Sequence, residues 1–359
     1  GGTIDSLSEN GFLADFGPNS ILHTTGHLDS LIRFAGLAAE LSPADKKSNK
    51  RFVLKNGKLF PLPVSPLAFV ATPLFSWKAK LRLLKEPFIG RGKGEESIGG
   101  FARRRLGAEF LDYAVGPFVS GVYAGDPDKL SVRWAFSKVY ALEEKYGSLV
   151  LGAVRGARER RQREKAGETG KQKARLINFK NGMASLPHAL AKRLKNQILL
   201  NTEALNLRKT ENGWEVEYQE GGQSKREQAK NIVLSIPAYS AHSLVRSLDG
   251  RFADLLGEIP YAAVSQVFFG LRRAQVDHPL DGFGALFPQK ENRQILGVLM
   301  NSTLFPGRAP EGHVALTCFL GGAKRPDLVE KNDGELLEIV LNELSEILGL
   351  KGFPVYCKI

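Results

Sequence analysis

The stretch from Gly116 to Leu130 constrains the fold more than any other part of this 359-residue sequence. It is rich in glycine, proline and large apolar residues, and it lies between two stretches with apolar residues at helical spacing, 95–115 and 131–160. Gly121 and Gly125 lack a Cβ atom where the backbone bends or another group approaches closely. The sequence therefore predicts two helices joined by a buried corner.

Composition places the chain among ordinary folded proteins. It is 43% apolar and 25% charged, and its length predicts two or three domains. The formal net charge of +12 allows nucleic acid, anionic lipid or an acidic ligand as a partner and selects none of them. Basic residues are concentrated in 155–175, where no aromatic residue occurs. Because base stacking needs aromatic side chains, this run predicts a solvated linker and no nucleic-acid partner.

The cysteines and the apolar stretches bear on location. With only Cys318 and Cys357, a disulfide scaffold is excluded and a reducing compartment is expected. We expect the cytoplasm of a bacterium, with peripheral contact to its inner membrane, or an organelle of a eukaryote. No apolar run reaches the ~18 residues of a membrane span. The stretch 60–77 is interrupted by prolines and followed by basic residues, so two interpretations stay open: a loop packed on its own domain, or a segment resting on an anionic membrane surface.

Short alternating patterns predict strands in several parts of the chain. The sequence 51–59 predicts a β-hairpin around Asn56-Gly57, one of the strongest short turn signals. In the last third, strands and a helix alternate and predict a mixed sheet with one helical face. The other predicted elements are helices at 28–41, 184–194 and 334–348 and strands at 198–200, 201–207, 214–218, 231–237, 265–270, 294–300 and 313–320. The expected fold class is mixed α/β.

Several blocks of sequence resemble one enzyme family. The segment Phe118–Asp126, followed by Lys129-Leu130-Ser131, is similar to the signature of the flavin-dependent protoporphyrinogen oxidases, especially the plastid and bacterial forms. Further similar blocks in the last third are Gly282–Pro288, Leu296–Leu299, Phe305–Pro310 and Phe319–Ala323. The resemblance covers nearly the whole chain in consistent order.

The resemblance implies a non-covalent FAD cofactor. In flavin enzymes of this type a Gly-Gly pair continues the dinucleotide-binding unit, and an Asp-x-Gly-Pro turn like that at Asp15–Pro18 lies beside the isoalloxazine ring. A looser match places the backbone of Ala204 against the adenine. The implied cofactor-binding residues are Gly1, Gly2, Gly17, Pro18, Asn19, Ser20 and Ala204. Because the Gly-x-Gly-x-x-Gly phosphate turn is absent from the sequence, we expect the chain to be part of a longer protein.

The resemblance also implies a substrate and a reaction. Family members oxidise protoporphyrinogen IX, or in some bacteria coproporphyrinogen III, in successive two-electron steps with O₂ as the acceptor. Arg51 would hold a propionate, since a guanidinium pairs bidentately with a carboxylate, although an arginine at a strand start is most often a surface charge. The residues implied to shape the slot for the macrocycle are Gly125, Leu286, Leu299 and Phe319. Without the resemblance, the three apolar strand residues would be assigned to the core.

No side chain stands out as a general acid or base, so we assign no catalytic residue. This suits a flavin oxidase, in which the cofactor carries the chemistry. His23 and His27 are four residues apart, but Gly26 weakens a helix between them, so no metal site is expected.

The resemblance implies a domain organisation as well. It comprises an incomplete Rossmann-like FAD-binding domain made of 1–45 and 177–242, a helical membrane-associated domain at 46–176, and a mixed-sheet substrate-binding domain at 243–359. Two rival functions stay open: another amine oxidase or carotenoid desaturase, which would share the flavin turns, and an inactive tetrapyrrole-binding fragment. The sequence leaves the oligomeric state open, a homodimer included.

Overall fold

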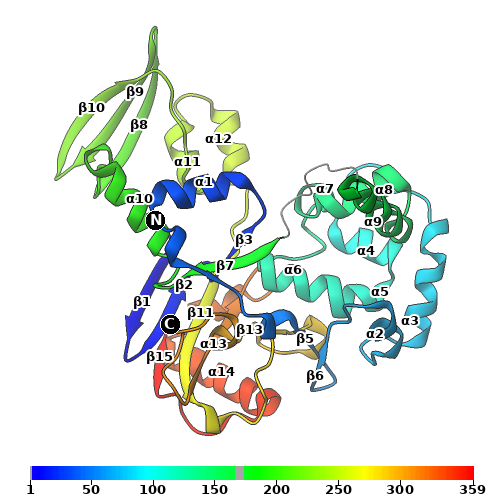
Figure 1. Ribbon diagram of the computed structural model, residues 1–359. Helices are drawn as coiled ribbons and strands as arrows, with labels where there is room; N and C mark the ends of the chain where they lie inside the picture. The colour runs from blue at the N-terminus through cyan, green and yellow to red at the C-terminus, as the bar shows by residue number, and fades with distance from the viewer. Residues whose placement is uncertain (1, 166–173) are drawn as a thin grey trace. The chain divides into compact units, whose positions relative to one another are not determined.

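The computed structural model describes residues 2–165 and 174–359 (Figure 1). Contacts between residues divide the chain into two compact units, Gly1–Ala189 with Ala262–Ile359 and Leu190–Tyr261. The predicted linker begins inside helix α9 (Leu149–Lys165), and its part at 166–173 lies outside the described residues. Within the described ranges, no helix is both long enough and apolar enough to cross a lipid bilayer.

The larger unit is built on a seven-stranded mixed sheet with the strand order β15-β11-β14-β13-β12-β5-β6. β12 runs parallel to β5, and all other neighbours are antiparallel. The predicted hairpin is present, with positive φ at Asn56 and Gly57 as its tight turn requires. The strands are β5 (Arg51–Lys55), β6 (Lys58–Pro61), β11 (Val264–Arg272), β12 (Gly284–Leu286), β13 (Ile295–Leu299), β14 (His313–Gly321) and β15 (Tyr356–Lys358). The mixed α/β fold class and the strands predicted in the last third are confirmed.

One face of this sheet carries the main hydrophobic core. Alternate strand residues such as Phe269 and Cys318 point to this face and are fully buried. Helix α14 (Asp333–Leu348), capped at its start by Asn332, covers them with residues that include Val340. The helix predicted at 334–348 is therefore confirmed, and the burial of this face leaves the opposite face available for a site.

A hairpin near the N-terminus packs on that opposite face. It consists of β1 (Asp5–Glu9) and β2 (Phe12–Phe16). Phe12 stacks on Tyr356 with 5.3 Å between the ring centroids. A Cβ atom at Gly270 would lie 2.2 Å from the Phe12 ring, so the ring fits because position 270 is glycine. This packing brings the end of β2 onto the sheet.

A small three-stranded sheet follows the hairpin. Its order is β3 (Ile21–His23), β7 (Arg175–Phe179) and β4 (Leu41–Pro43). The helix predicted at 28–41 is shorter than expected, because α1 (Gly26–Ala35) ends where Gly36 adopts the left-handed conformation with φ 74°.

Residues 66–165 are mainly helical. Their elements are α2 (Pro66–Ala71), α3 (Trp77–Arg82), the 3₁₀ helix η3 (Leu83–Phe88), α4 (Ile98–Arg105), α5 (Ala108–Phe110), the π-helix η4 (Leu111–Val115), α6 (Gly116–Tyr123), α7 (Val132–Ala135), α8 (Ser137–Tyr146) and α9. Arg105 is fully buried and forms ion pairs with Glu86 and Glu143. Since loss of one partner would leave an unpaired buried charge, these pairs hold α4, α8 and η3 together.

The predicted corner at 116–130 is largely wrong. Most of it is helix α6, because Pro117 is tolerated in a first turn and Gly116 has helical dihedral angles. The chain turns only after Tyr123, where Ala124 adopts the left-handed conformation with φ 48°. The single helix predicted at 95–115 is also interrupted, at Gly107 with φ 100°.

The smaller unit, Leu190–Tyr261, contains a three-stranded antiparallel sheet and two helices. These are β8 (Thr202–Thr210), β9 (Gly213–Glu220), β10 (Gln223–Ala229), α11 (Ala238–Val245) and α12 (Gly250–Gly257). Helix α10 (Ser185–Leu194) precedes them and confirms the helix predicted at 184–194. The strand predicted at 231–237 is wrong: Val233 is 88% exposed, and no strand among the described residues pairs with this segment. An apolar run forms a strand only where neighbours supply hydrogen bonds.

Candidate active site

The register of the seven-stranded sheet places the predicted substrate residues of its strands on one face. Arg51 opens β5, Leu286 lies in β12, Leu299 in β13 and Phe319 in β14. The ladder pairs that connect them are Arg51–Gly284, Gly284–Leu299, Leu286–Gly297 and Gly297–Phe319. Because paired residues and alternate residues of a strand share a face, all four side chains point away from the main core.

Helix α6 lies over this face. A Cβ atom at Gly121 would lie 2.3 Å from Cδ2 of Leu286, so the glycine lets the helix approach the strand closely. The sequence pattern correctly indicated a close approach at Gly121, and the approaching group is the Leu286 side chain.

A cavity of about 650 Å³ lies between the end of α6, the end of β2 and the sheet. Its volume is within the ~300–1,000 Å³ typical of small-molecule sites. The lining residues carry apolar or uncharged polar side chains; they are Thr3, Phe16, Gly17, Ser120, Gly121, Val122, Tyr123, Ala124, Ala262, Val264, Ser265, Gln266, Leu296, Phe319 and Ile359. Such a lining suits a large flat apolar ligand.

The turn predicted to contact the flavin forms part of the cavity wall. Gly17 has φ 77°, and a Cβ atom on it would lie 2.4 Å from the backbone oxygen of Thr3. The Asn19 amide donates to the Gly17 oxygen at 3.1 Å and accepts from Asn301 at 3.0 Å. Asn178 donates to the Asn19 backbone oxygen at 2.8 Å. These bonds hold the turn in one conformation.

A buried carboxylate lies directly behind this turn. Asp15 is 2% exposed and accepts hydrogen bonds from Ser6 Oγ at 2.6 Å and the Met183 backbone N–H at 2.7 Å. It also pairs with Arg308, whose Nη2 lies 3.2 Å from Oδ2. Burial lowers the pKa of the Arg308 guanidinium, and neither of its Nη atoms has a hydrogen-bond partner among the described residues. The turn is therefore backed by a buried charge pair.

The other predicted substrate residues lie at different distances from the cavity. Phe319 lines it, whereas Leu286 packs among the apolar side chains of the helical region. Arg51 is exposed, and its guanidinium lies 5.0 Å from the Phe283 ring centroid. A Cβ atom at Gly125 would lie 2.7 Å from Leu130, so this glycine allows packing within the corner. The substrate roles of these residues stay predictions.

The remaining predicted cofactor residues are spread over the chain. Gly2 has φ 59° and open space around its α-carbon, while Gly1 lies outside the described residues. Pro18 and Ser20 belong to the turn described above. Ala204 is exposed in β8, next to an irregularity in its pairing with β9. Contacts of these residues with FAD stay predictions.

Of the residues that line the cavity, only Gly17 and Phe319 had been given a site role from the sequence, and Gln266 and Ala124 are among those that sequence reasoning missed. Gln266 is a half-buried amide in the otherwise apolar middle of β11, in phase with the site-facing Phe268. A polar residue within an apolar run was a sequence signal for a residue at the site. Ala124 lines the cavity in the left-handed conformation, and its only sequence signal was the Ala-Gly pair after a helix.

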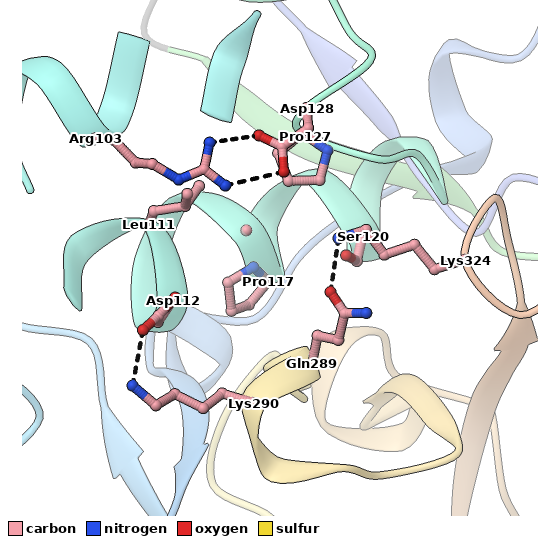
Figure 2. A pocket seen from close by; sticks show the side chains of 11 residues that line it. Arg103, Leu111, Asp112, Pro117, Ser120, Pro127, Asp128, Gln289, Lys290 and Lys324 are labelled. Carbon is pink, nitrogen blue, oxygen red and sulfur yellow. Dashed lines mark hydrogen bonds and ion pairs between the residues drawn. The ribbon is translucent and has the colours of Figure 1, made fainter. Parts of the chain in front are cut away.

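A second cavity of about 390 Å³ also touches α6, and Ser120 lines both cavities. Figure 2 shows Arg103 facing Asp128, with two hydrogen bonds of 2.7 and 2.9 Å. The other cations of this cavity are paired too, through Lys290–Asp112 at 2.9 Å and Lys324–Gln289 at 2.6 Å. An anionic ligand would have to displace these partners, so we do not place the substrate there.

Comparison with known proteins identifies the family. The model of the flavin containing amine oxidoreductases matches residues 1–358. The mitochondrial protoporphyrinogen oxidase of Nicotiana tabacum is 31% identical over 99% of this chain and 76% of its own length. The chloroplastic enzyme of the same plant is 35% identical over 97% of this chain and 66% of its own length. The chain thus spans two thirds to three quarters of these relatives.

More distant matches agree. The coproporphyrinogen III oxidase of Bacillus subtilis is 26% identical over 99% of this chain and 76% of its own length. A crystal structure from Exiguobacterium sp. 255-15, provisionally named a protoporphyrinogen oxidase, superposes with a TM-score of 0.81 at 21% identity, covering 99% of this chain and 76% of that one. The flavin cofactor and the family predicted from the motifs are confirmed: the chain belongs to the flavin-containing amine oxidoreductases, with protoporphyrinogen and coproporphyrinogen oxidases as its relatives.

Proposed function

We propose that the protein is a porphyrinogen oxidase. It uses FAD to oxidise protoporphyrinogen IX or coproporphyrinogen III to the corresponding porphyrin, with O₂ as the electron acceptor, in tetrapyrrole biosynthesis. The observation that carries this proposal is the uncharged cavity between the Gly17 turn and the sheet face that holds Phe319. The names of the relatives agree with it.

The residues of the cavity fit a flat cofactor ring. The glycine at position 17 lets the turn lie against the backbone of Thr3, and Phe16 and Gly17 supply one wall of the cavity. When bound, the flavin supplies two-electron oxidation of the substrate carbon. In this proposal residues 1–45 and 177–242 serve FAD binding, 46–176 the helical part and 243–359 the substrate.

The chain's own residues bind and orient the substrate. Phe319 and Leu299 offer apolar contact to a macrocycle, and Arg51 on the same face anchors a propionate by a bidentate ion pair. Arg51 and Phe319 lie three strands apart, which is about 14 Å at the usual strand spacing. A tetrapyrrole with its propionate arms can bridge that distance.

The lining also agrees with a reaction that uses no side chain as acid or base. No lining side chain of the cavity is charged. In each step the substrate loses a hydride and a proton, and O₂ takes up two electrons and two protons to give hydrogen peroxide. Since the pyrrole nitrogens supply the electrons that expel the hydride, positioning of the reacting carbon is the protein's main contribution.

We also propose peripheral contact with a membrane through the segment 64–88. Its exposed apolar side chains include Leu67 at 85% and Phe88 at 89% exposed. The others are Val64, Val70, Trp77, Leu81 and Leu84, and Lys78, Lys80, Arg82 and Lys85 lie in the same segment. Apolar side chains beside cations match an anionic lipid surface. Co-sedimentation with anionic vesicles, lost in L67E/F88E, tests this contact.

An assay of the flavin-loaded protein tests the main proposal. Protoporphyrin or coproporphyrin fluorescence should rise with time when the matching porphyrinogen and O₂ are supplied. Putrescine and phytoene, as substrates of the rival oxidases and desaturases, should give no flavin reduction. Flavin reduction by either rival compound and none by a porphyrinogen would refute the proposal, and absence of bound flavin would favour the inactive fragment.

A further inference from the structure

We propose that Gln266 is a positioning residue that fixes the distance between the two walls of the cavity, the turn at Phe16–Gly17 and the sheet face at Phe319. The inference rests on the proposed function, because it takes the cavity as the place where cofactor ring and substrate meet. Neither the motifs nor the family resemblance assigns any role to Gln266.

The Gln266 amide binds the backbone on both sides of Phe16. Its Nε2 donates to the backbone oxygen of Asp15 at 2.6 Å, and its Oε1 accepts from the Gly17 N–H at 3.2 Å. These two backbone groups flank a single residue, which is the pattern that one residue of a parallel neighbouring strand would satisfy. The side chain therefore replaces a missing strand at the outer edge of β2, which pairs only with β1 in the described sheet.

The chemistry of the two backbone groups selects an amide. The Asp15 oxygen needs a donor and the Gly17 N–H needs an acceptor, so the orientation of the Gln266 amide is unambiguous. A methionine of similar length supplies neither, and an ionised glutamate supplies only the acceptor and places a negative oxygen against the Asp15 carbonyl. Asparagine is one methylene too short to span the same gap.

The position of Gln266 in β11 connects this amide to the substrate wall. Gln266 and Phe319 are direct partners in the β11–β14 ladder, so their side chains lie next to each other on the same face. Both line the cavity. Gln266 thus ties the sheet that carries Phe319 to the hairpin that carries Gly17.

The rest of the turn is already immobilised from behind. Asp15 accepts from Ser6 and Met183, and Asn19 is held by Asn178 and Asn301. Gln266 holds the turn from the cavity side. Loss of its two hydrogen bonds should let Phe16 and Gly17 move toward or away from Phe319. Hydride transfer requires reacting atoms within about 3–3.5 Å, so a small shift there lowers turnover strongly.

Gln275 offers a matched control. It follows the C-terminal end of β11 by three residues. Its Nε2 donates to the backbone oxygens of Lys351 and Phe353, and its Oε1 accepts from the Arg272 N–H, each at 2.9 Å. It makes the same kind of backbone clamp without lining the cavity. Gln275→Met therefore loses comparable bonds with no effect on the cavity walls.

The experiment compares Gln266→Met, Gln275→Met and the unmodified protein. Amide hydrogen exchange, which needs no bound cofactor, should accelerate about tenfold over residues 12–20 in Gln266→Met only, because this variant loses both hydrogen bonds between the side chain and that segment. In the flavin-loaded protein, Gln266→Met should release flavin faster, shift its visible spectrum and lower kcat about tenfold or more. Gln275→Met should leave all three flavin readouts unchanged.

Gln266→Glu adds a reversible test. A protonated carboxyl has both a donor and an acceptor, so protection over residues 12–20, measured relative to the intrinsic amide exchange rate at each pH, should return as the pH falls through the pKa of the introduced carboxyl. Gln266→Met should show no such recovery.

Two outcomes would refute the positioning role. The first is that the amides of Gln266→Met exchange at the wild-type rate. The second is that flavin binding and turnover are unchanged although exchange is faster. Wild-type protein that binds flavin but oxidises no porphyrinogen would instead refute the proposed function, and the exchange and spectral readouts would still decide the role of Gln266.

Discussion

The two cavities beside helix α6 differ in charge. The cavity that contains Phe319 and the Gly17 turn has an uncharged lining, whereas the cavity that contains Arg103 carries cations that are held by partners (Figure 2). Ser120 contributes to both. Helix α6 thus has one side on an uncharged cavity and another on a network of ion pairs. In the function that we propose, the first side serves ligand binding and the second anchors the helix.

This difference follows from the free-energy cost of placing a charged side chain in each cavity. The ion pairs of the second cavity are partly exposed, so water screens them and their desolvation cost is small. A charge in the first cavity would lose water when a flat ligand bound, which would cost binding energy unless it found a partner. In the function that we propose, the anionic groups of a porphyrinogen therefore lie outside the uncharged cavity, on the side of the sheet face where Arg51 is exposed.

The largest effect is expected from a change in the wall of the uncharged cavity. Gly17→Ala should abolish flavin binding and lower turnover at least about 100-fold, because a Cβ atom would overlap the Thr3 backbone oxygen and the left-handed conformation adds ~1–2 kcal/mol of strain. Flavin absorbance of the purified variant measures the loss. Gly57→Ala is the control: it has the same strain at φ 72° but open space around it, and it should keep its flavin.

The next effect concerns the predicted anchor. Arg51→Ala should raise the KM for porphyrinogen about 10–100-fold, the equivalent of a lost hydrogen-bonded charge pair of ~1.5–3 kcal/mol, and should leave flavin binding unchanged. Lys50→Ala, which removes a neighbouring cation paired with Asp281, should leave KM unchanged. An unchanged KM in Arg51→Ala would remove the anchor and open the question of which cation binds the carboxylates.

Much of the larger unit was predictable from local sequence. The hairpin at Asn56-Gly57 and the strands β11, β13 and β14 follow from turn chemistry and alternation, which depend on residues close in sequence. The helix α14 was equally clear. Failures occurred where distant contacts decided the conformation. The sequence predicted a corner where the structure has helix α6. The contact that accounts for Gly121 is made by Leu286, which belongs to a strand far along the chain.

The candidate site was predictable only in part. The resemblance led to the Gly17 turn and to Phe319, and both line the same cavity. It could not lead to Gln266 or Ala124, because their placement depends on the register of β11 with β14 and on the left-handed end of α6. Such features arise from tertiary packing and leave only weak marks in a single sequence.

The charged cavity yields a smaller expected effect. Lys290→Met with Lys324→Met should change KM and kcat for porphyrinogen by less than about twofold. Lys290 is bound to Asp112 and Lys324 to Gln289, and both lysines line the charged cavity and not the uncharged one. Steady-state kinetics measures this. A KM increase comparable to that of Arg51→Ala would show that substrate carboxylates enter the charged cavity, and the distinction between the two cavities would fail.

The smallest expected effect is a pH dependence confined to the charged cavity. The hydrogen bond from Arg103 holds the pKa of Asp128 below its ordinary value. For a carboxyl whose pKa is lowered by folding, the stabilisation is present above the unfolded-state pKa and is lost as the pH falls through the folded-state pKa. Because both side chains are about half exposed, the whole effect should shift Tm by less than about 2 °C.

Arg103→Gln isolates this contribution. Its Tm should fall less steeply than that of the wild type between about pH 5 and about pH 3, since the variant no longer lowers the pKa of Asp128. The exposed Arg251, in the smaller unit, supplies a control in which Arg251→Gln keeps the wild-type slope. Flavin absorbance should stay the same in both variants, because neither change reaches the uncharged cavity. If Arg103→Gln released flavin, the network around Arg103 would have to act across α6, and the two sides of the helix could no longer be treated as independent.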